Sequence, residues 1–220
     1  MPTSRQGEPA WRTITIEDSS PPVGFARLDG DRTSGAFAAL VRFPAGWTRP
    51  GTGRYAVDEE LLVLEGEFRM SGVAYRIDDY AHLPGGYVRA DSMAPRDTLV
   101  IAFFSGPADW IRLRDAEPTS LPASPIAWRK VAPRPSPVAG RARPLRAADA
   151  ESTWLVDGPF EARAPHDMRI QLFSLPTRSW ANVEPGGSIP TLQLPCLCRL
   201  RRGSEAGGRG FAVDRDLSDV

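Results

Sequence analysis

Glycine and proline recur through this chain at short intervals and limit what it can fold into. The 220 residues include 20 glycines and 22 prolines. These separate short apolar runs that follow one another about every eight to twelve positions, a spacing typical of strands joined by turns. No stretch of about twelve or more residues has a convincing helical period. The sequence therefore predicts an all-β protein.

Several runs in the first half have the length and composition of strands. Each is rich in apolar residues and is bounded by glycine, proline, serine or aspartate. We expect strands at 36–43, 59–65, 67–70, 73–77, 79–83 and 98–104.

The charge balance limits the classes of partner. The chain has 27 basic and 27 acidic residues, so it lacks the basic excess by which general nucleic-acid and membrane-surface binders attract phosphate. No apolar run approaches the roughly 20 residues of a membrane-spanning helix, and the first residues have no apolar signal-peptide core. We expect a cytoplasmic protein that binds neither nucleic acid nor membranes.

Histidine and cysteine are scarce, which restricts metal chemistry. The sequence has only two histidines, His82 and His166. A three-histidine site within one chain is therefore excluded, and a two-histidine, one-carboxylate iron site would need both. Cys196 and Cys198 are too few for a disulfide framework or a structural zinc site, so we expect buried thiols.

The two halves of the chain share weak sequence similarity. Similar short segments recur at an offset of 115 to 117 residues, which suggests a duplicated β-unit. The matching segments are 11–12 with 128–129, 24–27 with 140–143, and 38–41 with 153–156.

Composition divides the chain further. Residues 113–139 are dense in proline, alanine and serine, as in a semi-extended linker. We expect a barrel at 20–112, that linker, a degenerate β-unit at 140–200, and a flexible polar tail at 201–220.

Residues 43–104 resemble the cupin family, whose motifs are G-x5-H-x-H-x3,4-E-x6-G and G-x5-P-x-G-x2-H. The string PAGWTRPGTGRYAVDEELLVLEGEF supplies Gly46, Glu59 and Gly66, and DDYAHLPGGYVR supplies Pro84 and Gly86. The strings VLEGEF and Y-x3-P-x-G are similar to those of ChrR-like and two-barrel (bicupin) relatives. The resemblance implies a double-stranded β-helix, or jelly-roll, barrel, duplicated as a bicupin with a degenerate second unit.

The metal-binding histidines of that family are replaced here. Residues 52–55, where the first-motif histidines should fall, are TGRY, and Arg89 stands where the last histidine belongs. Only Glu59 of the four usual ligands remains, and a nearby guanidinium repels a divalent cation. We therefore expect no cofactor, with a divalent metal as the alternative.

A carboxylate inside a barrel is costly unless it is paired. The space of the family's metal site would therefore hold a Glu59–Arg89 ion pair, with Arg54 nearby. Either the pair only fills that site, or a surplus arginine faces the cavity and holds a substrate carboxylate or enolate. The expected ligand-binding residues are Arg54, Tyr55, Glu59, Tyr87 and Arg89, the tyrosines as hydrogen-bond donors or as cavity walls.

His82 is the candidate general acid or base, because the unperturbed pKa of histidine lies near neutrality. Glu59 and His82 are accordingly the catalytic candidates if His82 faces the cavity. The alternative is a hydrogen-bonded structural histidine.

The strand at 59–65 is apolar on both faces. Successive side chains point to opposite faces, so Glu59 should face inward with Leu61, while Leu62 and Leu64 face outward. Glu60 should be solvated or interfacial. A strand that is apolar on both faces is covered on both, which predicts packing against a second barrel or a second copy, and we expect a homodimer.

Three functions remain open. The first is a metal-independent cupin that binds a small polar or anionic molecule in its barrel. The second is an enzyme (a dioxygenase, isomerase or cyclase) with an atypical metal or acid–base site. The third is a regulatory or dimerisation module, which the ChrR resemblance implies. Because cupins use one barrel for many chemistries, the fold does not decide between them. We favour the first.

Overall fold

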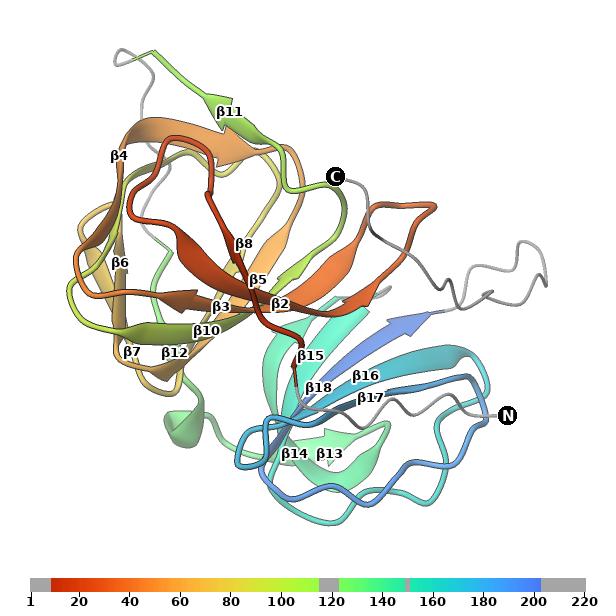
Figure 1. The fold of residues 1–220 in the computed structure, drawn as a ribbon. Helices are drawn as coiled ribbons and strands as arrows, with labels where there is room; N and C mark the ends of the chain where they lie inside the picture. Colours follow the sequence, from red (N-terminus) through yellow and green to blue (C-terminus); the bar gives the residue numbers. More distant parts are fainter. Residues whose placement is uncertain (1–8, 115–122, 149–150, 203–220) are drawn as a thin grey trace.

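The computed structural model describes residues 9–114, 123–148 and 151–202 (Figure 1). Within these ranges the chain forms antiparallel strands and one short 3-10 helix, η1 (Trp128–Lys130). The all-β class is confirmed. The described residues contain no helix long and apolar enough to cross a membrane.

Two sheets form the first unit and face each other as a jelly roll. The first sheet has the order β1-β2-β3-β10-β5-β8-β12 within the described residues. Its strands are β1 (Arg12–Ile14), β2 (Val23–Gly30), β3 (Phe37–Phe43), β5 (Glu59–Glu65), β8 (Asp79–Leu83), β10 (Thr98–Phe104) and β12 (Ile126–Ala127).

The second sheet covers the inner face of the first. Its order is β11-β4-β9-β6-β7 in the part of the chain that is described. Its strands are β4 (Trp47–Tyr55), β6 (Glu67–Met70), β7 (Val73–Arg76), β9 (Arg89–Ala94) and β11 (Trp110–Arg112). Buried side chains of both sheets, such as Val63 from the first and Met70 from the second, share one core.

The second unit is built on a third sheet, with the order β13-β14-β15-β18-β16-β17 among the described residues. Its strands are β13 (Arg134–Ser136), β14 (Ala139–Ala147), β15 (Glu151–Val156), β16 (Met168–Ser174), β17 (Trp180–Val183) and β18 (Cys196–Arg202). Segments 157–167 and 184–195 contribute Ala164, Phe160 and Ile189 to the core on its inner face. The expected degenerate second unit is therefore present, with loops on that face.

The third sheet repeats the strand order of the first. Position for position, β13, β14, β15, β18, β16 and β17 match β1, β2, β3, β10, β5 and β8. One row of paired residues makes the match explicit. In the first unit the row runs Asp29, Ala38, Phe103, Glu60, His82, and in the second it runs Arg146, Thr153, Arg199, Gln171, Asn182.

The equivalence that the internal sequence similarity predicted is confirmed for one pair of strands. Residues 38–41 and 153–156 are matching parts of β3 and β15, and Leu40 and Leu155 both face the other unit. The other two matches are wrong in detail. Residues 11–12 reach β1 whereas 128–129 lie in η1, and Ala26 and Ala142 face different cores.

The outer faces of the first and third sheets pack on each other. Leu62 and Leu64 of β5 share a buried core with Leu155, Phe173 and other side chains of the second unit. The second unit of the same chain thus covers the outer apolar face of β5. That face is therefore no evidence for a second copy of the chain, and a homodimer stays a prediction.

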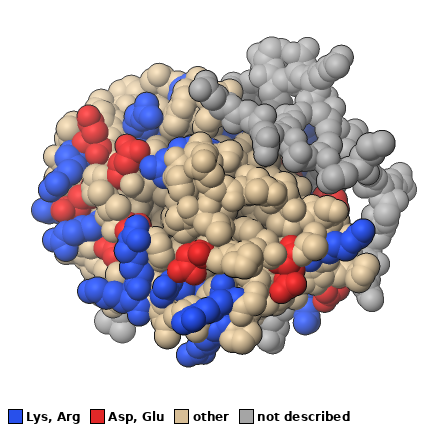
Figure 2. Space-filling view, turned by 90° about the horizontal axis from the view of Figure 1, so that it is seen from below, with Lys and Arg blue, Asp and Glu red and all other residues tan. Residues whose placement is uncertain are grey.

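All six strands expected in the first half are present, with ends within one residue. The segment expected as a linker contains β12, η1 and β13. Of the expected tail, residues 203–220 lie outside the described residues, and the exact domain boundaries stay a prediction. On the face seen in Figure 2, basic and acidic side chains are interspersed, as the balanced charge implies.

Candidate ligand site inside the first barrel

Glu59 and Arg89 meet inside the first barrel. Arg89 Nη1 donates to Glu59 Oε2 at 2.5 Å. Only 8% of Glu59 and 5% of Arg89 is exposed. The alternation of β5 turns Glu59 inward, and the second cupin-like motif places Arg89 at the start of β9. The ion pair that the sequence predicts is present.

A second buried guanidinium, Arg49, lies in the same interior. Only 4% of Arg49 is exposed. Its Nη1 donates to the Tyr55 hydroxyl at 2.9 Å, and its Cζ lies 4.2 Å from the centroid of the Trp110 ring. Among the described residues no carboxylate forms an ion pair with Arg49. Sequence reasoning missed this residue because Pro50, Gly51 and Gly53 made β4 resemble a loop.

Gly53 leaves the space that the Trp110 indole fills. A Cβ placed on Gly53 would lie 2.2 Å from Trp110 Cζ2, which no side chain tolerates. Gly53 pairs with Arg89, and Tyr55 pairs with Trp110, so these residues line one face of β4. The indole of Trp110 therefore covers Gly53, within the 52–55 segment where the sequence placed the first-motif histidines.

The interior has more positive than negative charge. Among the described residues, Glu59 pairs with Arg89 and no carboxylate pairs with Arg49, and the Nε atoms of both arginines are buried there without a hydrogen-bond partner. Buried polar atoms are nearly always paired, so two orphaned donors whose guanidinium groups both lie on the Tyr55 ring point to a group that accepts from them.

Aromatic rings form the wall beside the two arginines. Tyr55 and Phe104 meet edge to face with centroids 5.3 Å apart, and Phe104 stacks on Phe37 at 4.8 Å. Trp110 packs against Tyr55, and Arg89 Cζ lies 4.8 Å from the Tyr55 ring centroid. The arrangement can hold an anion between guanidinium groups and a planar group between rings.

These residues do not suit a divalent cation. The inward positions of β4 and β9 offer Gly53, Tyr55 and Arg89, and Arg89 already engages the carboxylate of Glu59. In the described parts of the chain, no group of three or more His, Cys, Asp or Glu side chains is placed to hold a metal.

Of the other expected ligand residues, Arg54 and Tyr87 have their described contacts outside this cluster. Arg54 pairs with the exposed Ile111, on the face of β4 opposite to Tyr55. Tyr87 is buried in the barrel core, where its hydroxyl accepts from the Ala123 N–H at 2.9 Å. The contact with Ala123 ties Tyr87 to the segment that follows the barrel.

His82 lies on the other face of the first sheet. It pairs with Glu60, not Glu59, across β5 and β8, and its Nε2 lies 3.1 Å from Asp58 Oδ2. Glu59 and His82 therefore do not face one cavity. The structure instead brings His82 to the interface with the second unit, as a hydrogen-bonded residue.

That interface holds a buried ion network centred on Glu60. Arg146 Nη1 donates to Glu60 Oε1 at 2.8 Å, Arg199 Nε donates to the same oxygen at 3.1 Å, and Tyr80 donates to Oε2 at 2.6 Å. Thr153 also donates to Oε2. Burial would raise the pKa of Glu60, but Arg199, Thr153, Tyr80 and Arg146 together hold it below its usual value.

Cys196 and Cys198 are both buried and free, as expected. Burial raises the pKa of the Cys196 thiol to about 12.

The fold defines the class of protein. The chain is a cupin-fold protein of the two-unit type, with a jelly-roll first unit and a reduced second one.

Comparison with known proteins supports the fold only. No family model matches the chain, and no curated protein matches it. A proposed dioxygenase from Nostoc punctiforme is 17% identical, with a TM-score of 0.61 over 99% of this chain and 81% of that one. Protein Ylba from E. coli is 12% identical, with a TM-score of 0.52 over 87% and 82% of the two chains.

The structural similarity to ChrR is weaker than that to the two proteins above. The complex of SigE with the anti-sigma ChrR from Rhodobacter sphaeroides is 25% identical over 44% of this chain and 50% of that one. Its TM-score of 0.36 is too low to support an argument.

Proposed function

We propose that the first barrel binds a small monoanion, a carboxylate carried on a planar apolar group, without a metal ion. The observation that carries this proposal is Arg49, a buried guanidinium with no carboxylate partner among the described residues. A buried charge without a counter-charge costs several kcal/mol. A bound anion would remove that cost.

The hydrogen-bond donors support the same ligand. The orphaned Nε atoms of Arg49 and Arg89 would each donate to one carboxylate oxygen, and guanidinium groups match carboxylates in geometry and charge. Glu59 would remain on Arg89 and hold it in place. Two arginines against Glu59 and one monoanion leave the interior neutral.

The aromatic wall supports a planar apolar body for the ligand. Tyr55 and Trp110 lie against the arginines, and Phe104 packs on Tyr55 behind them. Trp110 lies in β11, a three-residue strand that, within the described ranges, is at the edge of its sheet and pairs with the end of β4. The ligand would take the place of the indole against Arg49, and Trp110 would move outward.

Binding is better supported than catalysis. The dioxygenase description belongs to the N. punctiforme protein, and at 17% identity it does not transfer to this chain. The acid–base alternative needs Glu59 and His82 in one site, but they lie on opposite faces of the first sheet. No described contact specifically favours a regulatory role.

The test is calorimetric titration of chelator-treated protein with benzoate, and with benzamide as the neutral isostere. We expect benzoate to bind and benzamide to bind at least about tenfold more weakly, because hydrogen bonds to charged groups are worth about 1.5–3 kcal/mol. Arg49→Gln should weaken benzoate binding by a similar factor. Arg54→Gln, on the opposite face of β4, should not. Equal affinities for benzoate and benzamide, or binding unaffected by Arg49→Gln, would overturn the proposal.

A further inference from the structure

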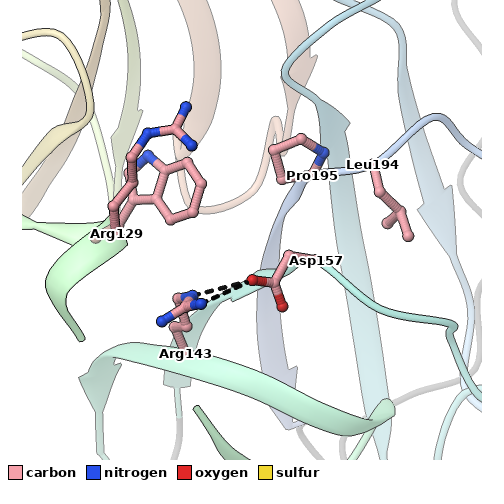
Figure 3. Close-up of a pocket in the computed structure, with 6 residues that line it drawn as sticks. Arg129, Arg143, Asp157, Leu194 and Pro195 are labelled. Carbon is pink, nitrogen blue, oxygen red and sulfur yellow. Dashed lines mark hydrogen bonds and ion pairs between the residues drawn. The ribbon is translucent and has the colours of Figure 1, made fainter. Parts of the chain in front are cut away.

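A cleft of about 400 Å³ lies where η1 meets the second unit (Figure 3). It is separate from the barrel interior, because none of its lining residues belongs to the Arg49 and Arg89 cluster. Its walls are Trp128, Arg129, Arg143, Asp157, Leu194 and Pro195. The volume falls within the range of small-molecule sites, which occur preferentially between domains.

The floor of the cleft is a fixed ion pair. Nε and Nη2 of Arg143 both lie 3.0 Å from Asp157 Oδ2, and Nη1 of Arg143 donates to the Val131 carbonyl at 2.5 Å. The guanidinium is thus held by the linker and by Asp157. The other carboxylate oxygen of Asp157, Oδ1, has no hydrogen bond to the described residues and remains available as an acceptor.

Arg129 provides the complementary donor. Its Nε is 2.5 Å from Asp78 Oδ2, and its guanidinium lies over the Trp128 ring with Cζ 4.3 Å from the centroid. The two terminal nitrogens of Arg129 form no hydrogen bond with the described residues. Figure 3 shows Arg129 at one side of the cleft and Asp157 on the floor, with the open space between them.

Leu194 and Pro195 form an apolar wall opposite Arg129 (Figure 3). Leu194 is one of the few large apolar side chains left exposed in the described structure, at 36%. The cleft thus offers the terminal nitrogens of Arg129 as donors, Asp157 Oδ1 as an acceptor and Leu194 as an apolar surface. These suit a ligand that has an acceptor, a donor and an apolar group.

We infer that this cleft binds a small zwitterion, an α-amino acid with an apolar side chain. The α-carboxylate would accept from the terminal nitrogens of Arg129, the ammonium would donate to Asp157 Oδ1, and the side chain would pack on Leu194 and Pro195. Charge then balances on both sides, because each free protein group receives its opposite.

Calorimetric titration with L-leucine tests the inference, with two analogues that each lack one charge. These are 4-methylpentanoate, without the ammonium, and 3-methylbutylamine, without the carboxylate. We expect L-leucine to bind and each analogue to bind at least about tenfold more weakly. No heat with L-leucine up to about 10 mM, the weak limit of specific binding, would overturn the inference, as would equal affinity for all three compounds.

Variants locate the site. Arg129→Gln, whose side chain is largely exposed, should keep the fold and weaken L-leucine binding at least about tenfold. Asp157→Asn should do the same if its melting temperature is unchanged. Arg141→Gln, an exposed arginine of β14 outside the cleft, should have no effect. Binding of L-leucine that survives Arg129→Gln would place it elsewhere and contradict the inference.

Discussion

Glu60 and Gln171 occupy the same place in the two units, and each contacts the equivalent strand of the other unit. Arg146 of β14 donates to Glu60, and Gln171 donates to Asp29 of β2 at 2.6 Å. Asp29 and Arg146 are themselves equivalent in strand pairing. The two units therefore meet about a local pseudo-two-fold relation, with ions on one side and an amide–carboxylate contact on the other.

The first prediction concerns the ionic side of this interface. Glu60→Ala leaves Arg146 and Arg199 with one carboxylate fewer in a buried site, which should lower the free energy of unfolding by about 3–5 kcal/mol. Chemical denaturation measures it. The control is Glu65→Ala, which removes an exposed contact with Arg178 and should cost at most about 1 kcal/mol. Similar decreases in the free energy of unfolding for both variants would show that the buried ion network does not stabilise the interface between the units.

The second prediction is the acid dependence of stability. The pKa of Glu60 is lowered, and so is that of Asp58, where burial is outweighed by the Gly85 N–H, His82 and Arg146. A carboxyl with a lowered folded pKa stabilises above its unfolded pKa of about 4, and this stabilisation is lost as the pH falls through the folded value.

Titration of Glu60 and Asp58 should therefore change the melting temperature little above about pH 5 and lower it as the pH falls below about 4. Glu60→Gln should lose part of that acid-dependent fall. A variant whose melting temperature follows the same pH curve as the wild type, merely displaced, would contradict the assignment.

The third prediction concerns Gly53 and Trp110. Gly53→Ala forces the indole away and should destabilise by about 1–3 kcal/mol as an overpacking change. In Gly53→Ala with Trp110→Ala the second change removes the clash with the ring and leaves only the 2.8 Å contact of the new Cβ with the Ile111 carbonyl, so the double variant should lose less than the sum of the two single losses. Gly140→Ala, where a Cβ meets nothing within 4 Å, is the control and should be near neutral. Additive losses would mean that the ring does not occupy the Gly53 space.

The fourth prediction separates an anion site from a metal site. Glu59→Gln keeps an amide oxygen that can accept from Arg89 and hold it in place, but removes the one negative charge that the described residues set against the two arginines, so benzoate affinity should rise, by about tenfold if one charge-assisted contact is gained. Calorimetry measures it, and Glu65→Gln is the exposed control. If Glu59 instead held a metal that bound the ligand, Glu59→Gln would weaken benzoate binding.

Much of the fold was predictable from the sequence because glycine and proline mark the ends of strands. β5 and β10 are nearly continuous apolar runs, and the motif spacing around Glu59, Gly66 and Pro84 carries the barrel resemblance. β4 was hidden, since Pro50 and two glycines interrupt it and its pairing with β9 shifts register between Arg49 and Thr52. Tertiary pairing maintains a strand there that local sequence disfavours.

The candidate site was predictable only in part. Motif spacing located Glu59 and Arg89, and the cost of burying a charge predicted their pairing. It did not locate Arg49, because one residue of register decides which side of a strand faces inward. The same sensitivity separates Tyr55, which faces the barrel interior, from Arg54, which does not. The ion network around Glu60 depends on the second unit, and no local pattern indicates Arg146 or Arg199 as its partners.

The most direct test of the central claim is calorimetric titration of benzoate into chelator-treated protein, with metal content measured on the same sample. The account predicts binding of benzoate at well under about 0.1 metal ion per chain, and weakening by at least about tenfold in Arg49→Gln. Binding that appears only after a metal is restored, near one ion per chain, would contradict it.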